Sequence, residues 1–106
     1  MKTYPVIWTL PAIDSLRDIF NFIKTDSPQG AKNVVTALVT LGNSLATLPA
    51  RNPVEPLLAD ELVTYRFAVK WNYKIIYTIE NESVMIVEVF DTRRDPSRLK
   101  VEPEMD

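Results

Sequence analysis

The chain has 106 residues, of which 25% are charged, and a formal net charge of −2. This length fits one domain with a core of its own, spanning residues 1–106. Cysteine and histidine are both absent, which excludes disulfides, thiolate nucleophiles and the commonest general base. We therefore expect neither a metal site nor a cofactor.

Charge and hydropathy also limit where the protein acts. No apolar run approaches the roughly 18 residues that a membrane span needs, and the prolines near the N-terminus are unlike a signal peptide, so we expect a cytoplasmic protein that contacts no membrane. Basic residues outnumber acidic ones by seven to five within residues 62–100, whereas residues 101–106 carry three acids. The last six residues are expected to form a flexible acidic tail.

A short strand and two amphipathic helices are predicted in the first half of the chain. Residues 4–9 are rich in β-branched and aromatic side chains, which favours a strand. Apolar residues then recur at helical spacing over residues 11–25. Ser27 and Pro28 are typical of a helix start. The second helix carries an apolar stripe that ends at Pro49 and comprises Val34, Leu38, Leu41, Leu45 and Leu48.

The second half predicts a loop followed by a sheet. Residues 49–61 contain three prolines, which argue against a helix or a central strand. Three strand-like runs follow at residues 62–70, 73–80 and 84–91, joined by short connections. They predict a three-stranded antiparallel meander.

Alternation of side chains sorts the residues of the meander onto two faces. The set of Val63, Tyr65, Phe67 and Val69 is expected to meet the helices, which leaves an exposed face with Arg66, Lys70, Lys74 and Glu88. The residues expected to be buried are Phe20, Leu38, Leu41, Phe67, Val87 and Val89.

Several local patterns resemble the RelE/ParE superfamily of toxins over about residues 4–100. The run from Asp14 to Ile23 is similar to the family's first helix. Tyr65-Arg66 followed by residues 73–77 (YKIIY) resembles its strand signature, and residues 89–96 (VFDTRRDP) resemble its closing segment. Asp91 departs from the pattern, since it is adjacent to where many relatives have histidine.

The resemblance implies an α+β fold with the order β-α-α-β-β-β, in which a helical hairpin packs on one face of a small antiparallel sheet. It also implies the toxin of a type II toxin-antitoxin system of the ParE-like, plasmid stabilisation type. A cognate antitoxin would fold over the toxin and neutralise it in a hetero-oligomer.

The superfamily divides into ParE-like members, associated with inhibition of DNA gyrase, and RelE-like members, which cut messenger RNA on the ribosome. RNA cleavage needs a base, an acid and cations against the phosphorane, and here Glu88 would have to be the base, with Arg66, Lys74 and Arg93 around it. No histidine is present, no tyrosine follows Tyr77, and the pI is about 5.1. We therefore favour gyrase inhibition over RNA cleavage.

The cations available to bind a target are Arg66, Lys70, Lys74, Arg93, Arg94 and Arg98. A plainer interpretation is equally open for Arg93 and Arg94, which could simply pair with the carboxylates of Asp91 and Asp95. A third alternative is a degenerate module that binds its antitoxin without being toxic.

Overall fold

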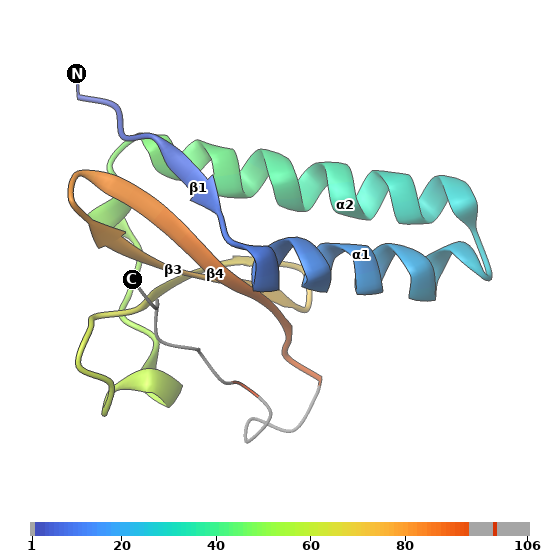
Figure 1. The fold of residues 1–106 in the computed structure, drawn as a ribbon. Coiled ribbons are helices and arrows are strands. Elements are labelled where there is room, and N and C mark those ends of the chain that lie inside the picture. Colours follow the sequence, from blue (N-terminus) through green and yellow to red (C-terminus); the bar gives the residue numbers. More distant parts are fainter. Residues whose placement is uncertain (1, 94–98, 100–106) are drawn as a thin grey trace.

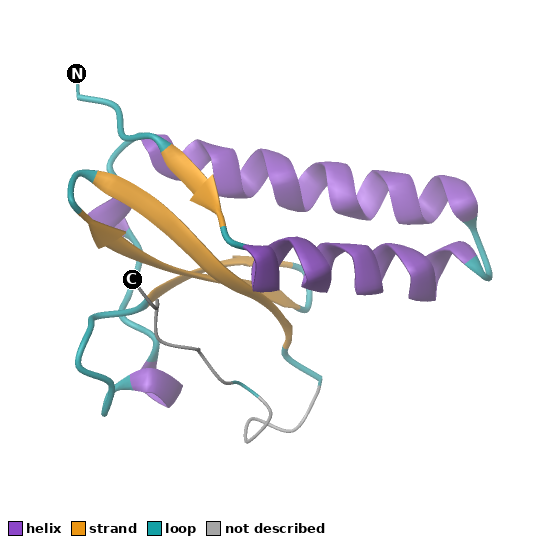
Figure 2. Ribbon diagram, viewed as in Figure 1, coloured by secondary structure: helices purple, strands orange, loops and turns teal. Residues whose placement is uncertain are grey.

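The fold follows the predicted order of elements (Figures 1 and 2). The computed structural model describes residues 2–93 and Leu99, so the expected tail at 101–106 lies outside the described residues. Three short 3₁₀ turns lie between the second helix and the meander, at Ser44–Ala46, Pro49–Arg51 and Pro56–Leu58. The helices and strands are β1 (Val6–Trp8), α1 (Leu10–Lys24), α2 (Pro28–Asn43), β2 (Arg66–Lys70), β3 (Tyr73–Glu80) and β4 (Ser83–Asp91).

The second helix begins where the sequence predicts and ends earlier. The Ser27 hydroxyl accepts a hydrogen bond from the Gly30 amide at 2.9 Å, and Pro28 occupies the first turn, where its missing N–H costs nothing. The helix ends at Asn43 rather than at Pro49. Leu48 has a φ of 48° and is 59% exposed. The other four members of the apolar stripe belong to the core or pack against it, namely Val34, Leu38, Leu41 and Leu45. In the described part of the chain, no helix is both long and apolar enough to cross a membrane.

The four strands form one sheet in the order β1-β4-β3-β2. β1 lies parallel to β4, with Val6 opposite Val84, and the other two pairs are antiparallel. A parallel pair needs a long crossover connection, and the helical hairpin is part of that crossover. The expectation of a small, mostly antiparallel sheet with the helices on one face is confirmed.

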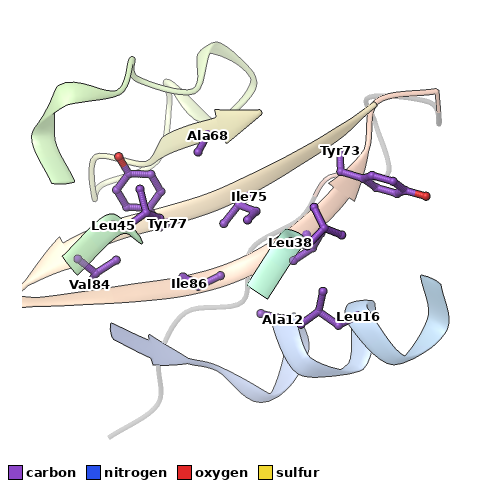
Figure 3. Packing of buried hydrophobic residues seen from close by; sticks show 11 residues of the cluster. Ala12, Leu16, Leu38, Leu45, Ala68, Tyr73, Ile75, Tyr77, Val84 and Ile86 are labelled. Carbon is purple, nitrogen blue, oxygen red and sulfur yellow. The ribbon is translucent and has the colours of Figure 1, made fainter. Parts of the chain in front are cut away.

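One face of the sheet packs against the helices (Figure 3). Trp8 of β1 lies against α2, where its indole N–H donates to the Asn43 side chain at 3.0 Å. Gly42 lies directly beneath the ring, because its missing side chain leaves the space that the indole fills. The buried core on this side comprises Ala12, Leu16, Leu38, Leu45, Ala68, Tyr73, Ile75, Tyr77, Val84, Ile86 and Val89.

The opposite face is covered as well, by the proline-rich loop and by Leu99. Leu58 of that loop and Leu99 pack against Ile76 and Phe90 of the sheet. In Figure 1 this loop, drawn in yellow-green, lies on the side of the sheet away from the helices. Tyr65, Phe67 and Val87 are partly buried in the same cluster.

This second cluster shows that the predicted assignment of faces was wrong for β2. The register places Ala68 opposite Ile75 and Arg66 opposite Tyr77, and both partners belong to the helix-side core. Phe67 therefore points away from the helices. Among the residues expected to be buried, Leu38 and Val89 are buried, whereas Phe20, Leu41, Phe67 and Val87 are only partly buried.

Gly42→Ala tests the contact between β1 and α2. A Cβ at this position would lie 2.6 Å from the Trp8 ring at Cη2 and 3.0 Å from the end of Ile86. We expect a net loss of about 1–2 kcal/mol. Contacts this short with a rigid ring place the cost in the upper part of the about 1–3 kcal/mol that overpacking takes, and the gain in helix propensity is only about 1 kcal/mol. Thr36→Ala, at an exposed position of the same helix, is the control in urea unfolding. Equal or greater stability of Gly42→Ala would contradict the packing.

Candidate functional site

The prediction that the basic residues of the meander share one exposed face is wrong, because they lie on opposite sides of the sheet. Arg66 and Lys70 pair with Tyr77 and Tyr73 on the helix side. The Arg66 guanidinium donates to the Asn52 carbonyl at 2.7 Å, and the Lys70 ammonium lies 4.9 Å from the Trp71 ring centre. Arg66 is therefore engaged with the loop, while Lys70 is at the surface.

Lys74 points to the other face and forms an ion pair with a buried carboxylate. Its ammonium lies 2.7 Å from Glu55 Oε1 and 4.4 Å from the centre of the Phe67 ring. Glu55 is fully buried, and its second oxygen accepts from the Leu57 amide at 3.2 Å. The ion pair between Lys74 and Glu55 therefore links the proline-rich loop to β3, an inner strand of the sheet.

Sequence reasoning missed Glu55. The available signal was its place immediately before Pro56, since Glu55 forms the N-cap of the 3₁₀ turn Pro56–Leu58. A second anchor of the same loop is Tyr77, whose hydroxyl donates to the Pro49 carbonyl and accepts from Asn52 at 3.1 Å. Burial raises the pKa of Tyr77, which keeps the hydroxyl protonated and suited to this structural bond.

Lys74→Ala is expected to lower the free energy of unfolding by about 3 kcal/mol, because it leaves a buried carboxylate without its cation. Lys70→Ala, which removes an exposed lysine of the preceding strand, should cost less than about 1 kcal/mol. The single variant Lys74→Met also leaves the Glu55 carboxylate unpaired. Adding Glu55→Gln to it removes that charge and should restore part of the lost free energy of unfolding. Urea denaturation measures all four variants. A Lys74→Ala variant as stable as Lys70→Ala would show that the pair does not hold the loop.

A cleft of about 400 Å³ opens between α1 and the ends of β3 and β4. It combines apolar and charged side chains from both sides. Its lining residues are Ser15, Asp18, Ile19, Phe22, Tyr73, Glu88, Val89, Phe90, Asp91 and Arg93.

A β-bulge directs Glu88 toward this cleft. The register passes from Ile76 opposite Glu88 to Tyr77 opposite Ile86, so Val87 is the extra residue. Bulges re-aim neighbouring side chains, and here the Glu88 carboxylate accepts from the Ser15 hydroxyl of α1 and from the Val89 amide at 2.9 Å. Glu88 is therefore held against the wall formed by α1.

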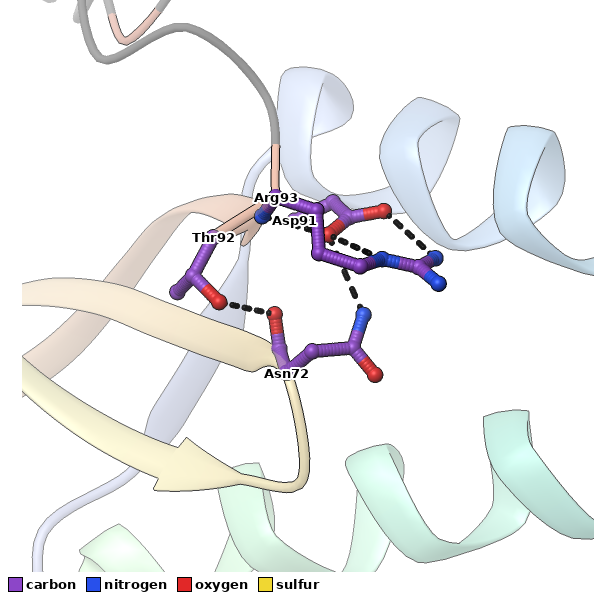
Figure 4. A network of polar contacts seen from close by, with 4 residues as sticks. All are labelled: Asn72, Asp91, Thr92 and Arg93. Atoms are coloured by element: carbon purple, nitrogen blue, oxygen red, sulfur yellow. Dashed lines mark hydrogen bonds and ion pairs between the residues drawn. The ribbon is translucent and has the colours of Figure 1, made fainter.

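Asp91 is the centre of a polar network at the end of β4 (Figure 4). Its carboxylate pairs with the Arg93 guanidinium at 2.9 Å and accepts from the Asn72 amide at 3.1 Å. The backbone carbonyl of Asn72 in turn accepts from the backbone amide and the hydroxyl of Thr92, at 2.8 and 2.9 Å. The hydrogen bond from Arg93 is the main reason that the pKa of Asp91 is lowered to about 2.

Of the four residues that RNA cleavage would need, only Glu88 and Arg93 line the same cleft. Arg66 is bound to the loop, and Lys74 is paired on the opposite face. Arg94 and Arg98, also expected to bind a target, lie outside the described residues, as does Asp95. Within residues 2–93 and at Leu99, no group of three acidic side chains is placed to hold a metal ion.

The Asp91 network should stabilise the protein in a pH-dependent way. A carboxyl with a pKa of about 2 when folded and about 3.9 when unfolded contributes stability that is complete above about pH 5 and is lost as the pH falls toward 2. The difference in unfolding free energy between the wild type and Asp91→Asn should therefore narrow between pH 5 and pH 2. Arg93→Ala should weaken the same dependence. A difference that is as large at pH 2 as at pH 6 would contradict the network.

The family of the chain is shown by its sequence. A family model described as "ParE toxin of type II toxin-antitoxin system, parDE" matches residues 6–96. The chain belongs to this family of ParE toxins. No curated protein sequence is significantly similar to this ParE-family toxin.

Solved structures of toxin-antitoxin systems share the fold. A chain of the chromosomal ParDE system from P. aeruginosa aligns with a TM-score of 0.67 at 17% identity, covering 82% of this toxin and 94% of that chain. A chain of the toxin-antitoxin complex RelBE2 from Mycobacterium tuberculosis aligns with a TM-score of 0.61 at 24% identity, covering 86% of this toxin and 93% of that chain. At these identities the likeness concerns the fold, which ParE and RelE toxins have in common.

Proposed function

We propose that this ParE-type toxin acts by binding and inhibiting DNA gyrase, and that a cognate antitoxin binds and neutralises it. The family match supports the ParE side of the superfamily. Both structural relatives come from toxin-antitoxin systems, which supports an antitoxin as the natural partner. The proposed mechanism is a protein-protein contact and involves no bond cleavage by the toxin.

One observation carries this proposal: the residues that RNA cleavage would require lie apart from one another rather than around one site. A nuclease must place a base, an acid and several cations around one phosphate. In the described part of the chain, Lys74 is neutralised by Glu55 and Arg66 is bound to the loop. Among the described residues that line the cleft of Glu88, Arg93 is the one arginine, and it is paired with Asp91. This arrangement favours recognition over catalysis.

The cations that could contact a target lie at the surface near the end of the sheet. The Arg93 side chain is 65% exposed despite its ion pair, and Lys70 is exposed at the end of β2. An exposed arginine or lysine can contact a carboxylate on another protein without unfolding its own site. Arg94 and Arg98 are the further candidates by sequence.

Induced expression of the toxin without its antitoxin provides the test. If gyrase is the target, replication should stop and a DNA-damage response should follow, while messenger RNA on ribosomes stays intact. Combined Arg93→Ala and Arg94→Ala should reduce toxicity through loss of target contact. Glu88→Gln should leave toxicity unchanged, because no proton transfer depends on Glu88.

Different outcomes would identify the alternatives. Ribosome-dependent cuts within codons of a reporter message, lost in Glu88→Gln by on the order of 10²-fold or more, would overturn the gyrase proposal in favour of a RelE-like endoribonuclease. A wild-type chain that binds its antitoxin but is not toxic would be a degenerate module. Unfolding curves of every variant are needed to separate loss of function from loss of stability.

A further inference from the structure

The hairpin that joins β2 to β3 carries an exposed tryptophan at its tip. Lys70 pairs with Tyr73 across the turn, so the loop consists of Trp71 and Asn72. Trp71 is 58% exposed, and the Lys70 ammonium lies 4.9 Å from the centre of its ring. Tryptophan is among the residues most concentrated at the centres of protein interfaces. The hairpin tip therefore has the composition of a contact surface, an aromatic ring with a cation beside it.

The backbone conformation at the tip is unfavourable for tryptophan. Trp71 has a φ of 54°, a left-handed conformation that a bulky side chain adopts only at a cost. Asn72 does not have a positive φ. A two-residue hairpin turn with a positive φ at its first residue alone normally takes glycine there. The turn itself therefore does not account for the tryptophan.

Core packing does not account for this tryptophan either. The other tryptophan of the chain, Trp8, packs against the helix-side core and donates its indole N–H to Asn43 at 3.0 Å. Trp71 belongs to neither of the two core clusters formed by the described residues. A ring that is costly for the turn and lies outside the core is better explained by a contact with another molecule, since backbone strain of this kind gathers at functional sites.

Hydrogen bonds fix the tip to the end of β4 (Figure 4). The backbone carbonyl of Asn72 accepts from the amide and the hydroxyl of Thr92, and the Asn72 side chain donates to Asp91 at 3.1 Å. Asp91 in turn pairs with the exposed Arg93. The turn that carries the ring is therefore held in place before binding, which lowers the entropy that a partner must remove.

We propose that Trp71 is the anchor through which the toxin contacts its target protein, with the ring entering an apolar recess and the Lys70 ammonium meeting a carboxylate at its rim. This inference rests on the proposed function, because it takes DNA gyrase as the target and adds an apolar contact to the cations assigned to it. A protein is favoured over a nucleic acid because the whole chain has a net charge of −2, whereas affinity for nucleic acid depends chiefly on Lys and Arg neutralising phosphates.

Inhibition of supercoiling by purified DNA gyrase measures the contribution of the ring. Trp71→Gly should raise the toxin concentration for half-maximal inhibition by about tenfold or more. Its urea midpoint should stay close to the wild-type value, because relief of the positive φ offsets the lost partial burial of the ring. Trp71→Phe keeps an aromatic ring and should retain most of the inhibition.

Leu62→Ala is the matched control, because it removes a fully exposed apolar side chain from the loop that precedes β2. Its half-maximal concentration should stay within about twofold of the wild-type value. Equal weakening by Leu62→Ala and Trp71→Gly would overturn the inference, because it would reflect a general loss of exposed apolar surface. A large fall in the urea midpoint of Trp71→Gly would also overturn it, because the ring would then serve the fold.

Oxidative footprinting of the wild-type toxin gives a readout that needs no substitution. Trp71 should react more slowly with hydroxyl radicals in the complex with DNA gyrase than in the free toxin, whereas Leu62 should react equally in both. Equal reactivity of Trp71 in both states would contradict the proposed contact. Binding of the toxin alone to a single-stranded oligonucleotide, lost in Trp71→Gly, would replace the protein contact by base stacking.

The outcomes separate this inference from the proposed function. If the wild-type toxin does not inhibit DNA gyrase, the proposed target fails and this inference fails with it. If the wild type inhibits and Trp71→Gly inhibits equally well, the hairpin tip is not the anchor, although the proposed function stands. Unchanged inhibition by Trp71→Gly together with weaker binding to the antitoxin would place the tip in the antitoxin interface and overturn the inference.

Discussion

The structure depends on burying the central strand β3 on both faces. Within Tyr73–Thr78 every residue is buried except Lys74, which is partly buried. One face needs the helical hairpin, and the other needs the proline-rich loop together with Leu99. Lys74 points toward the proline-rich loop, so that loop must supply a counter-charge. Glu55 provides it, with its Oε1 2.7 Å from the Lys74 ammonium. A buried pair of this kind is costly to break from either side.

Covering both faces determines where the chain can act. An antiparallel sheet often leaves one face in water, and a row of basic residues on such a face would suit a polyanion. In the described part of the chain neither face of β3 is open, so the exposed charged groups of the sheet lie at the ends of its strands. The exposed cations Lys70 and Arg93 lie at the end of the sheet, while Asp18 lies on the helix.

The sequence predicted the elements well because their signals are local. The helical spacing of apolar residues, the cap at Ser27 and the prolines of the loop each act within a few residues of where they occur. Alternation also sorted β2 correctly into two sets. It could not say which set meets the helices, since both sets contain apolar residues and only the pairing of Ala68 with Ile75 decides.

The candidate site was less accessible to prediction because it depends on contacts between distant segments. Nothing local to Glu55 reveals that it pairs with Lys74, nineteen positions later. The direction of Glu88 depends on a bulge that alternation alone does not contain. The plainer interpretation of Arg93 agrees with its ion pair to Asp91, because those residues are close enough in sequence for the charge pattern to be informative.

The proposed inhibition of DNA gyrase is a contact between two proteins, and a supercoiling assay with purified components tests it most directly. Added to DNA gyrase and relaxed plasmid, the toxin should inhibit supercoiling, and preincubation with its antitoxin should restore it. The same preparation should leave ribosome-bound messenger RNA uncut. Undiminished supercoiling at toxin concentrations that cleave ribosome-bound messenger RNA would contradict gyrase inhibition.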